Sequence, residues 1–471
     1  MKFYNTLTKQ MDDFVPLRKG VVSMYSCGLT VNSTPHIGHF KRYVMSDVLY
    51  RYLMYSGFEV KHVMNITDVG HAVGEDEMNE DKLQVKALAE NLSPWEVAHK
   101  YEEVFLNDLG KLNILKPTVI ARATEHVGEM INLIKCLDDN GYLYESSVGM
   151  MYDTSKFKTY ADFARLDLEN QVAGESTIND NERKNKSDFA VWIKNKPDHI
   201  MKWDSPWGVG YPGWHIECSA MAIHYLGETI DIHLGGIDHV NVHHTNEIAQ
   251  SEGATGKKFC NYWMHCGHLQ VDGEKMSKSL GNTYGIKELH EKGYSELSFR
   301  FMILKTDYKN AFNFTWENLH NAQNEYVKIL KQISNIETSI GGSVNEEFKS
   351  KFMQAMDSDL NTPLAIAVLH ELLASNISDA DKYATITDFD RVLGVDLANA
   401  RYILNVLEQL QGVDYLDRQK AQLLLKDRNE ARKNKDYKKA DEIRDEIKSK
   451  GYEVLDSKDG SRIELMEYGK L

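Results

Sequence analysis

The 471-residue chain has no long hydrophobic run, few cysteines and no excess of basic residues. The opening residues, Met1 to Thr6, contain no apolar stretch, so we expect no signal peptide. No segment approaches the roughly 20 consecutive apolar residues that a membrane-spanning helix needs. The five cysteines are odd in number and scattered, which argues against a disulfide framework. These absences predict a cytoplasmic protein with reduced thiols and no membrane partner.

The charge of the chain is acidic overall, with a formal net charge of −15. Such a charge counts against a nucleic-acid partner. Residues 418–450 are an exception, because they hold 12 basic and 7 acidic residues. A basic segment on an acidic body can bind RNA through a local patch, although a solvated helical face accounts for the same charge equally well.

Strand-like and helical patterns divide the chain into several parts. Strand-like runs occur at 21–25, 59–64, 229–234 and 262–271, and helical patterns fill 82–141 and 312–410. Residues 142–202 read as irregular and polar. The tail combines a helical stretch with strand-like runs at 452–455 and 463–465.

This order predicts an α/β protein with a Rossmann-like parallel-sheet catalytic domain that carries an insertion. An all-α bundle and a small α/β C-terminal module would follow. We expect the boundaries to be 1–110 for the first half of the catalytic domain, 111–201 for the insertion, 202–311 for the second half, 312–411 for the bundle and 412–471 for the tail.

Two short strings indicate a nucleotide site. The first, Pro35-His36-Ile37-Gly38-His39, follows a strand-like run and opens a helical segment. A helix N-terminus offers free N–H groups and partial positive charge to phosphate, and Gly38 lets a nucleotide lie close to the backbone. The second, Lys275-Met276-Ser277-Lys278-Ser279, brings two ammonium groups. Alone, this second string would read as an exposed basic turn, but the pair in this order predicts a triphosphate site.

Four residues have side chains suited to a zinc ion: Cys27, Cys218, His243 and Glu247. His243 and Glu247 are four residues apart, so on a helix they share one face. No pair has zinc-finger spacing, and the alternative is that both cysteines are simply buried thiols. We expect the other three cysteines to be buried thiols: Cys136, Cys260 and Cys266.

These strings together resemble the cysteinyl-tRNA synthetases, which are class I aminoacyl-tRNA synthetases. The resemblance runs from end to end, through residues 27–28, 36–39, 65–68, 212–218, 231–233, 246–250, 275–282, 428–432 and 440–445. It implies that ATP activates L-cysteine to cysteinyl-adenylate, which is then transferred to the 3′ end of tRNA(Cys). It also implies a zinc ion that selects cysteine over serine, Mg²⁺ that accompanies ATP, and an anticodon-binding tail. The alternative for the tail is a cap on the bundle. We expect the protein to be a monomer.

The resemblance assigns roles to individual residues. It implies one zinc ion held by Cys27, Cys218, His243 and Glu247, with His239 and His244 as the nearest competing ligands. It implies catalytic roles for His36, His39, Lys275 and Lys278. It also implies that Gly38, Asp238 and Lys278 bind ATP. Thr67 and Trp214 would line the cysteine pocket, although a packed structural tryptophan is equally compatible with Trp214.

The chain departs from the family pattern at Leu29, Asn32 and Lys41, where proline, tyrosine and arginine are usual. We expect these positions to affect the shape of the pocket rim.

Two other functions compete with the synthetase. A cysteine ligase of small-thiol biosynthesis shares the adenylating core and the zinc but lacks the anticodon domain. A non-catalytic RNA-binding paralogue would have no use for the two phosphate-binding strings.

Overall fold

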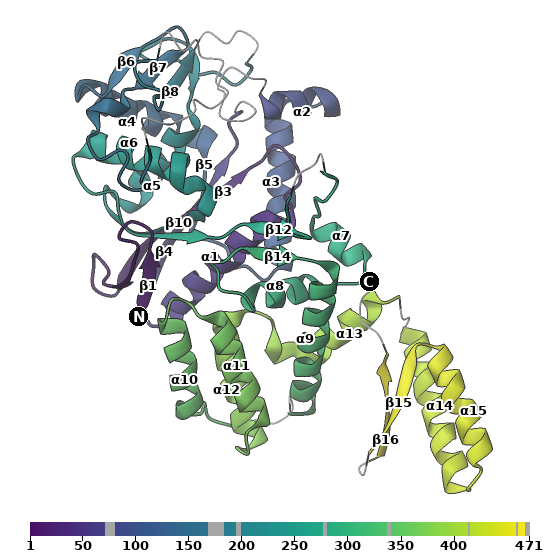
Figure 1. The fold of residues 1–471 in the computed structure, drawn as a ribbon. Helices are drawn as coiled ribbons and strands as arrows, with labels where there is room; N and C mark the ends of the chain where they lie inside the picture. The colour runs from purple at the N-terminus through teal and green to yellow at the C-terminus, as the bar shows by residue number, and fades with distance from the viewer. Residues whose placement is uncertain are drawn as a thin grey trace.

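A computed structural model of the chain describes residues 1–70, 81–167, 183–194, 199–276, 280–336, 341–412, 415–457 and 460–466. Its centre is a five-stranded sheet with the order β11-β10-β3-β4-β5, in which every neighbouring pair is parallel (Figure 1). The strands are β3 (Val21–Thr30), β4 (Glu59–Thr67), β5 (Val119–Arg122), β10 (Ile230–Gly236) and β11 (Cys260–Cys266). The predicted Rossmann-like sheet is confirmed. Only β5 was missed, inside a stretch predicted to be helical.

The strand order places a ligand site between β3 and β10. Strands β4 and β5, which follow β3 in the chain, lie on one side of it in the sheet. Strands β10 and β11, which come later in the chain, lie on its other side. Open α/β sheets bind ligands at such a switch point, outside the carboxyl ends of the strands. Cys27 lies near this end of β3, and Asp238 follows β10.

Helices cover both faces of the sheet. Successive strand residues point to opposite faces, so Met24 belongs to one buried cluster and Tyr25 to the other. Helix α1 (Ile37–Tyr55) packs with the Met24 cluster. Helices α4 (Val127–Asp139), α5 (Trp214–Leu226) and α6 (Thr245–Thr255) pack with the Tyr25 cluster. Helices α2 (Lys82–Glu90) and α3 (Pro94–Lys111) connect β4 to β5.

The region 142–202 is not irregular as predicted. It contributes three strands to a four-stranded antiparallel sheet of β6 (Leu143–Glu145), β7 (Gly149–Tyr152), β8 (Phe189–Lys194) and β9 (Gly210–Pro212). Most of these strands are three or four residues long, too short for a periodic pattern to stand out. The stretch 262–271 likewise forms two strands, β11 and β12 (Leu269–Val271), and β12 pairs with β13 (Glu274–Lys275) and β14 (Phe312–Phe314).

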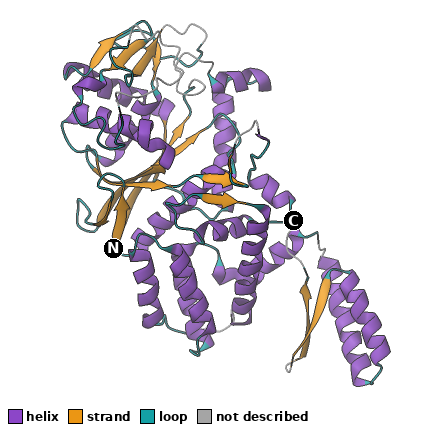
Figure 2. Ribbon diagram, viewed as in Figure 1, coloured by secondary structure: helices purple, strands orange, loops and turns teal. Residues whose placement is uncertain are grey.

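Helices below the sheet form the predicted bundle (Figure 2). Short helices α7 (Ile286–Glu291) and α8 (Glu296–Leu304) lead into it. It consists of α9 (Trp316–Ile336), α10 (Glu346–Asp357), α11 (Thr362–Ala374), α12 (Asp379–Leu393) and α13 (Ala400–Leu410). The first residues of the predicted helical segment, Phe312–Phe314, are strand instead, because they pair with β12.

A buried ionic cluster joins the catalytic domain to the bundle. Asp47 on α1 accepts from Arg51 Nε at 2.7 Å and from Arg300 Nη2 on α8 at 2.6 Å. Arg300 also donates to the carbonyl of Leu393 at the end of α12, at 2.8 Å. The side chains of Asp47 and Arg300 are fully buried. One carboxylate therefore pairs with two guanidinium groups at the point where three helices meet.

We expect Asp47→Asn to lower the free energy of unfolding by about 3–5 kcal/mol, because it leaves buried guanidinium charge uncompensated. Denaturant unfolding measures this loss. Asp139→Asn, at the exposed end of α4, is the matched control and should change the stability by less than about 0.5 kcal/mol. Equal unfolding midpoints for Asp47→Asn and the unsubstituted protein would contradict the role given to the cluster.

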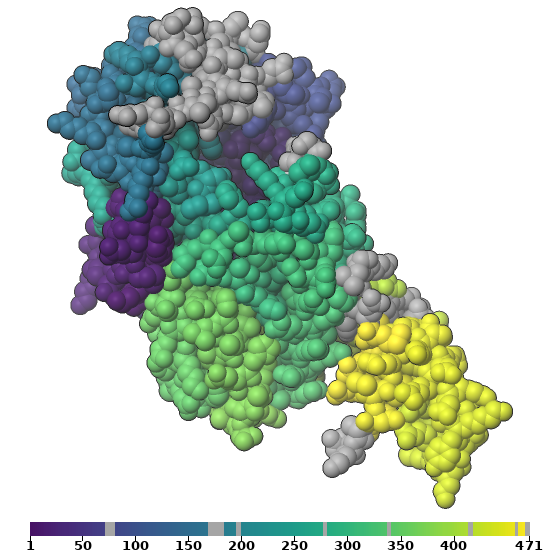
Figure 3. All heavy atoms as spheres, viewed as in Figure 1, coloured from purple at the N-terminus to yellow at the C-terminus, as the bar shows by residue number. Residues whose placement is uncertain are grey.

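The tail stands out from the body as a separate module (Figure 3). Helices α14 (Tyr415–Lys433) and α15 (Tyr437–Ser449) form a hairpin that packs on the antiparallel strands β15 (Tyr452–Ser457) and β16 (Gly460–Leu465). Ile443 and Ile447, one helical turn apart, are both buried. The expected helix and strand pair are therefore present.

Candidate active site and metal cluster

A cavity of about 510 Å³ opens at the carboxyl ends of β3, β4 and β10. Its walls bring together most of the residues predicted to form the site. The predicted residues in its lining are Cys27, His36, His39, Thr67, Trp214, Cys218, Asp238 and His243. Gly38, Lys275 and Glu247 do not line it. Lys278 lies outside the described residues.

The four predicted metal ligands meet at this cavity, and three of them, Cys27, Cys218 and His243, line it. One ligand atom from each of Cys27, Cys218, His243 and Glu247 lies within 4.8 Å of the others, and all four residues are buried. Cys27 comes from β3 and Cys218 from α5. The helical turn Val240–His244, which is π-helical, leads directly into α6 and carries His243 one turn before Glu247. Such π turns occur often at functional sites.

The local backbone near Cys27 requires glycine. A Cβ atom on Gly28 would lie 1.5 Å from the carbonyl oxygen of Asn65. The Gly28 N–H donates to Asn65 Oδ1 at 2.7 Å, and the pairing of β3 with β4 is irregular between Ser26 and Leu29. This close approach turns the end of β3 and places the Cys27 thiol in the cavity wall.

Burial and close contacts shift the pKa values of the cluster in different directions. Burial opposes ionisation of Cys27, but the hydrogen bond from Cys218 and the charge of His244 lower its pKa well below the usual range. Donating that hydrogen bond, together with burial, raises the pKa of Cys218. Burial also raises the pKa of Glu247 and lowers that of His244. Of the two buried thiols, Cys27 is therefore the one that ionises more readily.

A second possible ligand group shares two residues with the first. It consists of Cys27, His233, His244 and Glu247. The nitrogens of His244 already have partners, since Nε2 is 3.3 Å from Cys27 Sγ and Nδ1 is 2.7 Å from His265 Nε2. His233 Nε2 is 2.8 Å from Glu247 Oε2. His233 and His244 therefore support ligands of the first group, a role that sequence reasoning did not give to His233.

An unsatisfied oxygen marks where a cation fits. Glu247 Oε1 is buried and lies 3.1 Å from His243 Nε2 without forming a hydrogen bond of good geometry to a described residue, whereas its other oxygen is 2.8 Å from His233 Nε2. Buried carboxylate oxygens are rarely left in this state. Two sulfur atoms, one nitrogen and one oxygen form a donor set that zinc accepts. The residues present thus fit a zinc ion held by the predicted four.

The first of the two strings predicted to bind phosphate also contributes to the lining, through His36 and His39. His36 precedes α1, and its ring stacks on that of His39 with centroids 3.6 Å apart. Burial, then the charges of His36 and Arg42, lower the pKa of His39. A Cβ atom on Gly38 would lie 3.0 Å from the His36 ring and 3.7 Å from Met276 Cε. Met276 belongs to the second string, so the two strings meet here, whereas Lys275 on β13 is exposed.

Trp214 and Thr67 line the same cavity. The Trp214 ring stacks on His243, with centroids 4.4 Å apart, and 38% of the residue is exposed. It is therefore a wall of the cavity and not a packed core residue. Thr67 Oγ1 donates to Glu217 Oε2 at 2.9 Å, and Glu217 is fully buried. Thr67 thus has a fixed rotamer at the end of β4.

The three departures from the family pattern do not share one location. Leu29 and Asn32 line the cavity, as expected for its rim. Lys41 does not, because its ammonium group is buried and donates to the carbonyls of Gly267 at 2.9 Å and Asn310 at 2.6 Å. The expectation that Lys41 shapes the rim is therefore wrong. Helical rotation of about 100° per residue turns the neighbouring Arg42 toward the cavity instead.

Cys136 is exposed, so the expectation that it is a buried thiol is also wrong; Cys260 and Cys266 are buried. Helix α4 turns Cys136 away from the apolar face that holds Met130, Leu133 and Leu137.

Among the helices that the structure describes, none is both long and apolar enough to cross a bilayer.

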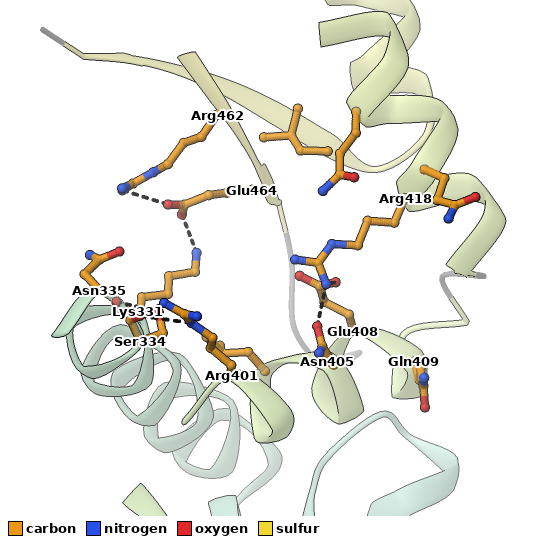
Figure 4. A pocket seen from close by; sticks show the side chains of 14 residues that line it. Lys331, Ser334, Asn335, Arg401, Asn405, Glu408, Gln409, Arg418, Arg462 and Glu464 are labelled. Atoms are coloured by element: carbon orange, nitrogen blue, oxygen red, sulfur yellow. Dashed lines mark hydrogen bonds and ion pairs between the residues drawn. The ribbon is translucent and has the colours of Figure 1, made fainter. Parts of the chain in front are cut away.

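The tail holds a second polar cavity at its junction with the bundle (Figure 4). Arg418 of α14 pairs with Glu408 of α13 at 2.9 Å, and Glu464 of β16 pairs with Lys331 of α9. Within the tail, Arg428 and Arg432 both pair with Asp456. Four lysines near the turn between α14 and α15 are exposed: Lys433, Lys435, Lys438 and Lys439.

Comparisons with known proteins agree along the whole chain. Residues 13–324 match the family described as the class I (C) tRNA synthetase catalytic domain, residues 351–413 match the DALR domain, and residues 418–463 match the cysteinyl-tRNA ligase anticodon binding domain.

Similar curated proteins include a cysteine-tRNA ligase of Treponema denticola, 39% identical over 96% of each chain. Cysteine-tRNA ligase 1 of Burkholderia lata is 40% identical over 100% of this chain and 98% of its own length. The solved structure of Mycobacterium tuberculosis methionyl-tRNA synthetase in complex with methionyl-adenylate has a TM-score of 0.56 at 16% identity, over 83% of this chain and 91% of that one. This last similarity concerns the fold alone.

Proposed function

Because the chain belongs to the cysteine-tRNA ligase family, an aminoacyl-tRNA ligase family, we propose that it charges tRNA(Cys) with L-cysteine through cysteinyl-adenylate. One observation supports the proposal: three residues of the cluster, Cys27, Cys218 and His243, line the same cavity as His36 and His39. A thiol held by the cluster and phosphates held by the histidines would bring the carboxyl group of cysteine and ATP into one cavity.

In the first step, a carboxylate oxygen of cysteine attacks the α-phosphorus of ATP. The bond from that phosphorus to the bridging oxygen breaks, and pyrophosphate leaves. Such displacement depends on positioning and charge stabilisation. His36 and His39 hold the phosphates at the start of α1, Lys275 and Lys278 stabilise the departing charge, and Mg²⁺ enters with ATP.

In the second step, a terminal ribose hydroxyl of tRNA attacks the carbonyl carbon of the adenylate. The carbon–oxygen bond to AMP breaks, and the cysteinyl group moves to the ribose. Asp238, which follows β10 and lines the cavity, would accept hydrogen bonds from the ribose of ATP. Gly38 allows the nucleotide to lie close to the start of α1.

Selection of cysteine requires more than packing, because a pocket distinguishes such small changes by only about 1–3 kcal/mol. When bound to Cys27, Cys218, His243 and Glu247, zinc would supply a site that prefers a thiolate to a hydroxyl. Trp214 and Thr67 would hold the rest of the amino acid beside it.

The tail supports an RNA partner. The exposed lysines near the α14–α15 turn supply phosphate contacts, and Tyr437 beside them is 60% exposed. Exposed aromatic rings accept stacked bases in single-stranded RNA. We therefore assign anticodon recognition to residues 412–471. The other domain boundaries are proposed as predicted from the sequence.

Two assays test the proposal against its competitors. Cysteine-dependent exchange of pyrophosphate into ATP, without RNA, separates an enzyme from an RNA-binding paralogue. A requirement for tRNA as acceptor separates a synthetase from a ligase that uses an amino sugar. Absence of exchange in the full-length protein supplied with zinc would contradict the proposed activation step.

We expect Lys278→Ala to slow adenylate formation by about 10²-fold while cysteine affinity changes little. The lysine charge matters most as pyrophosphate departs, which is a transition-state interaction. Single-turnover adenylation measures the chemical step, and equilibrium binding measures the affinity. Lys287→Ala, on exposed α7, is the control and should leave both unchanged. An unaltered rate in Lys278→Ala would mean that this lysine is only a surface charge.

A further inference from the structure

Arg42 is a cation in the cavity to which neither the resemblance nor the steps above give a role. It lies in the second turn of α1 and lines the cavity together with Cys27, His39 and Asp238. The preceding residue, Lys41, occupies the position where the family usually has arginine, but it is turned away into the interior. The guanidinium group in this cavity therefore comes from a different position of the helix.

The Arg42 side chain is held firmly by one of its nitrogens. Nη2 donates to the carbonyl oxygen of Gly28 at 3.1 Å and to the hydroxyl of Tyr43 at 2.8 Å. The guanidinium carbon also lies 4.8 Å from the centre of the Tyr43 ring. Both Nη2 hydrogens are thus used, and the plane of the group is set against the buried Tyr43.

The remaining nitrogens have no acceptor among the described residues. Nε is buried without a hydrogen-bond partner. In the part of the chain that the structure describes, no carboxylate oxygen lies within 4.0 Å of the Arg42 guanidinium group, so the group forms no ion pair there. Because Arg42 lines the cavity and its Nη2 hydrogens are occupied, the two N–H groups of Nη1 are left for a ligand.

The group keeps its charge. Burial acts to lower the pKa of Arg42, but Tyr43, Cys27 and Asp238 outweigh it and raise the pKa above its usual value. A guanidinium group that lines a cavity and has no carboxylate within ion-pair distance among the described residues favours an anionic ligand. The planar guanidinium matches carboxylate and phosphate oxygens in particular.

We propose that Arg42 binds an anionic oxygen at the reacting centre, from the carboxylate of cysteine or the α-phosphate of ATP. This inference rests on the proposed function. Arg42 lines the cavity together with Cys27, a proposed metal ligand, and Asp238, the proposed ribose contact. An adenylate held by both groups would bring its carboxyl–phosphate junction into the cavity that Arg42 lines. Arg42 therefore acts directly on the group that gains or transfers charge.

The test compares Arg42→Gln and Arg42→Lys with the unsubstituted protein. We expect cysteine-dependent pyrophosphate exchange to fall by about 10²-fold in Arg42→Gln, with partial recovery in Arg42→Lys. Calorimetric titrations with L-cysteine alone and with α,β-methylene ATP alone identify the source of the oxygen. Weaker binding of cysteine identifies the carboxylate, weaker binding of the nucleotide identifies the phosphate, and either result supports the proposal.

Arg18→Gln, at an exposed position outside the cavity, is the matched control and should behave as the unsubstituted protein. Zinc content and the thermal unfolding midpoint are measured for every variant. Exchange that is unchanged in Arg42→Gln would overturn the proposal. A loss of zinc in that variant would also overturn it, since Arg42 would then act through Gly28 on the metal ligands. Absence of exchange in the unsubstituted protein would instead contradict the proposed function.

Discussion

Replacing Cys218 with serine is expected to remove both the bound zinc and the activation of cysteine. Cys218 is one of two thiols in the cluster, and a hydroxyl is a far poorer zinc ligand than a thiolate. Loss of groups that merely support a metal ligand costs about 10- to 100-fold in metal affinity, so loss of a ligand should cost at least as much. Elemental analysis measures the zinc, and pyrophosphate exchange measures the activation.

Cys136→Ser is the matched control, because it makes the same chemical change at an exposed site on α4. It should keep full zinc content and full exchange. Thermal unfolding of both variants separates loss of the metal from loss of the fold. Full zinc occupancy in Cys218→Ser would exclude Cys218 as a ligand and would favour the alternative group that includes His233 and His244.

Ending the chain at Gly412 is expected to abolish efficient charging of tRNA while leaving RNA-free activation of cysteine nearly intact. Both phosphate-binding strings and all four proposed zinc ligands precede this point. The tail meets the bundle through polar contacts such as the Arg418–Glu408 pair (Figure 4). None of its described residues lines the cavity that holds His36 and His39. Charging of a tRNA(Cys) transcript and pyrophosphate exchange are measured on the same preparation.

The role of the tail is decided by comparing the loss of tRNA charging with the loss of pyrophosphate exchange. If both fall together, the tail is needed for the fold of the bundle and is the cap considered as its alternative role. If charging by the shortened and full-length proteins is equal, the tail does not read the anticodon. A full-length protein with Lys433, Lys435, Lys438 and Lys439 changed to Gln provides a second test, since it keeps the packing of the tail and removes only exposed charge. Its charging should fall and become less sensitive to salt.

The local pattern of apolar and polar residues was sufficient to locate many of the strands and helices of this fold. Strands β3, β4 and β10 combine apolar runs with flanking turns, and α1 follows a polar loop, so periodicity alone locates them. The short strands of the insertion were missed because three or four residues are not enough to show a period. The exposure of Cys136 was missed for another reason, since cysteine is usually buried and only its place on α4 turns it outward.

The sequence by itself determined which chemical groups this protein possesses: two strings suited to phosphate, and thiol, imidazole and carboxylate groups suited to zinc. Only the tertiary structure decided which of them meet. Cys27, Cys218 and Glu247 are separated by up to 220 residues in the chain, and the crossover of the sheet between β3 and β10 brings them within 4.8 Å. The roles of Lys41 and Arg42 likewise depend on helical rotation, on Asn310, which is 269 residues from Lys41, and on Gly28, which lies on a different element from Arg42. Spacing along a chain records local geometry, whereas contacts between distant segments exist only after those segments pack.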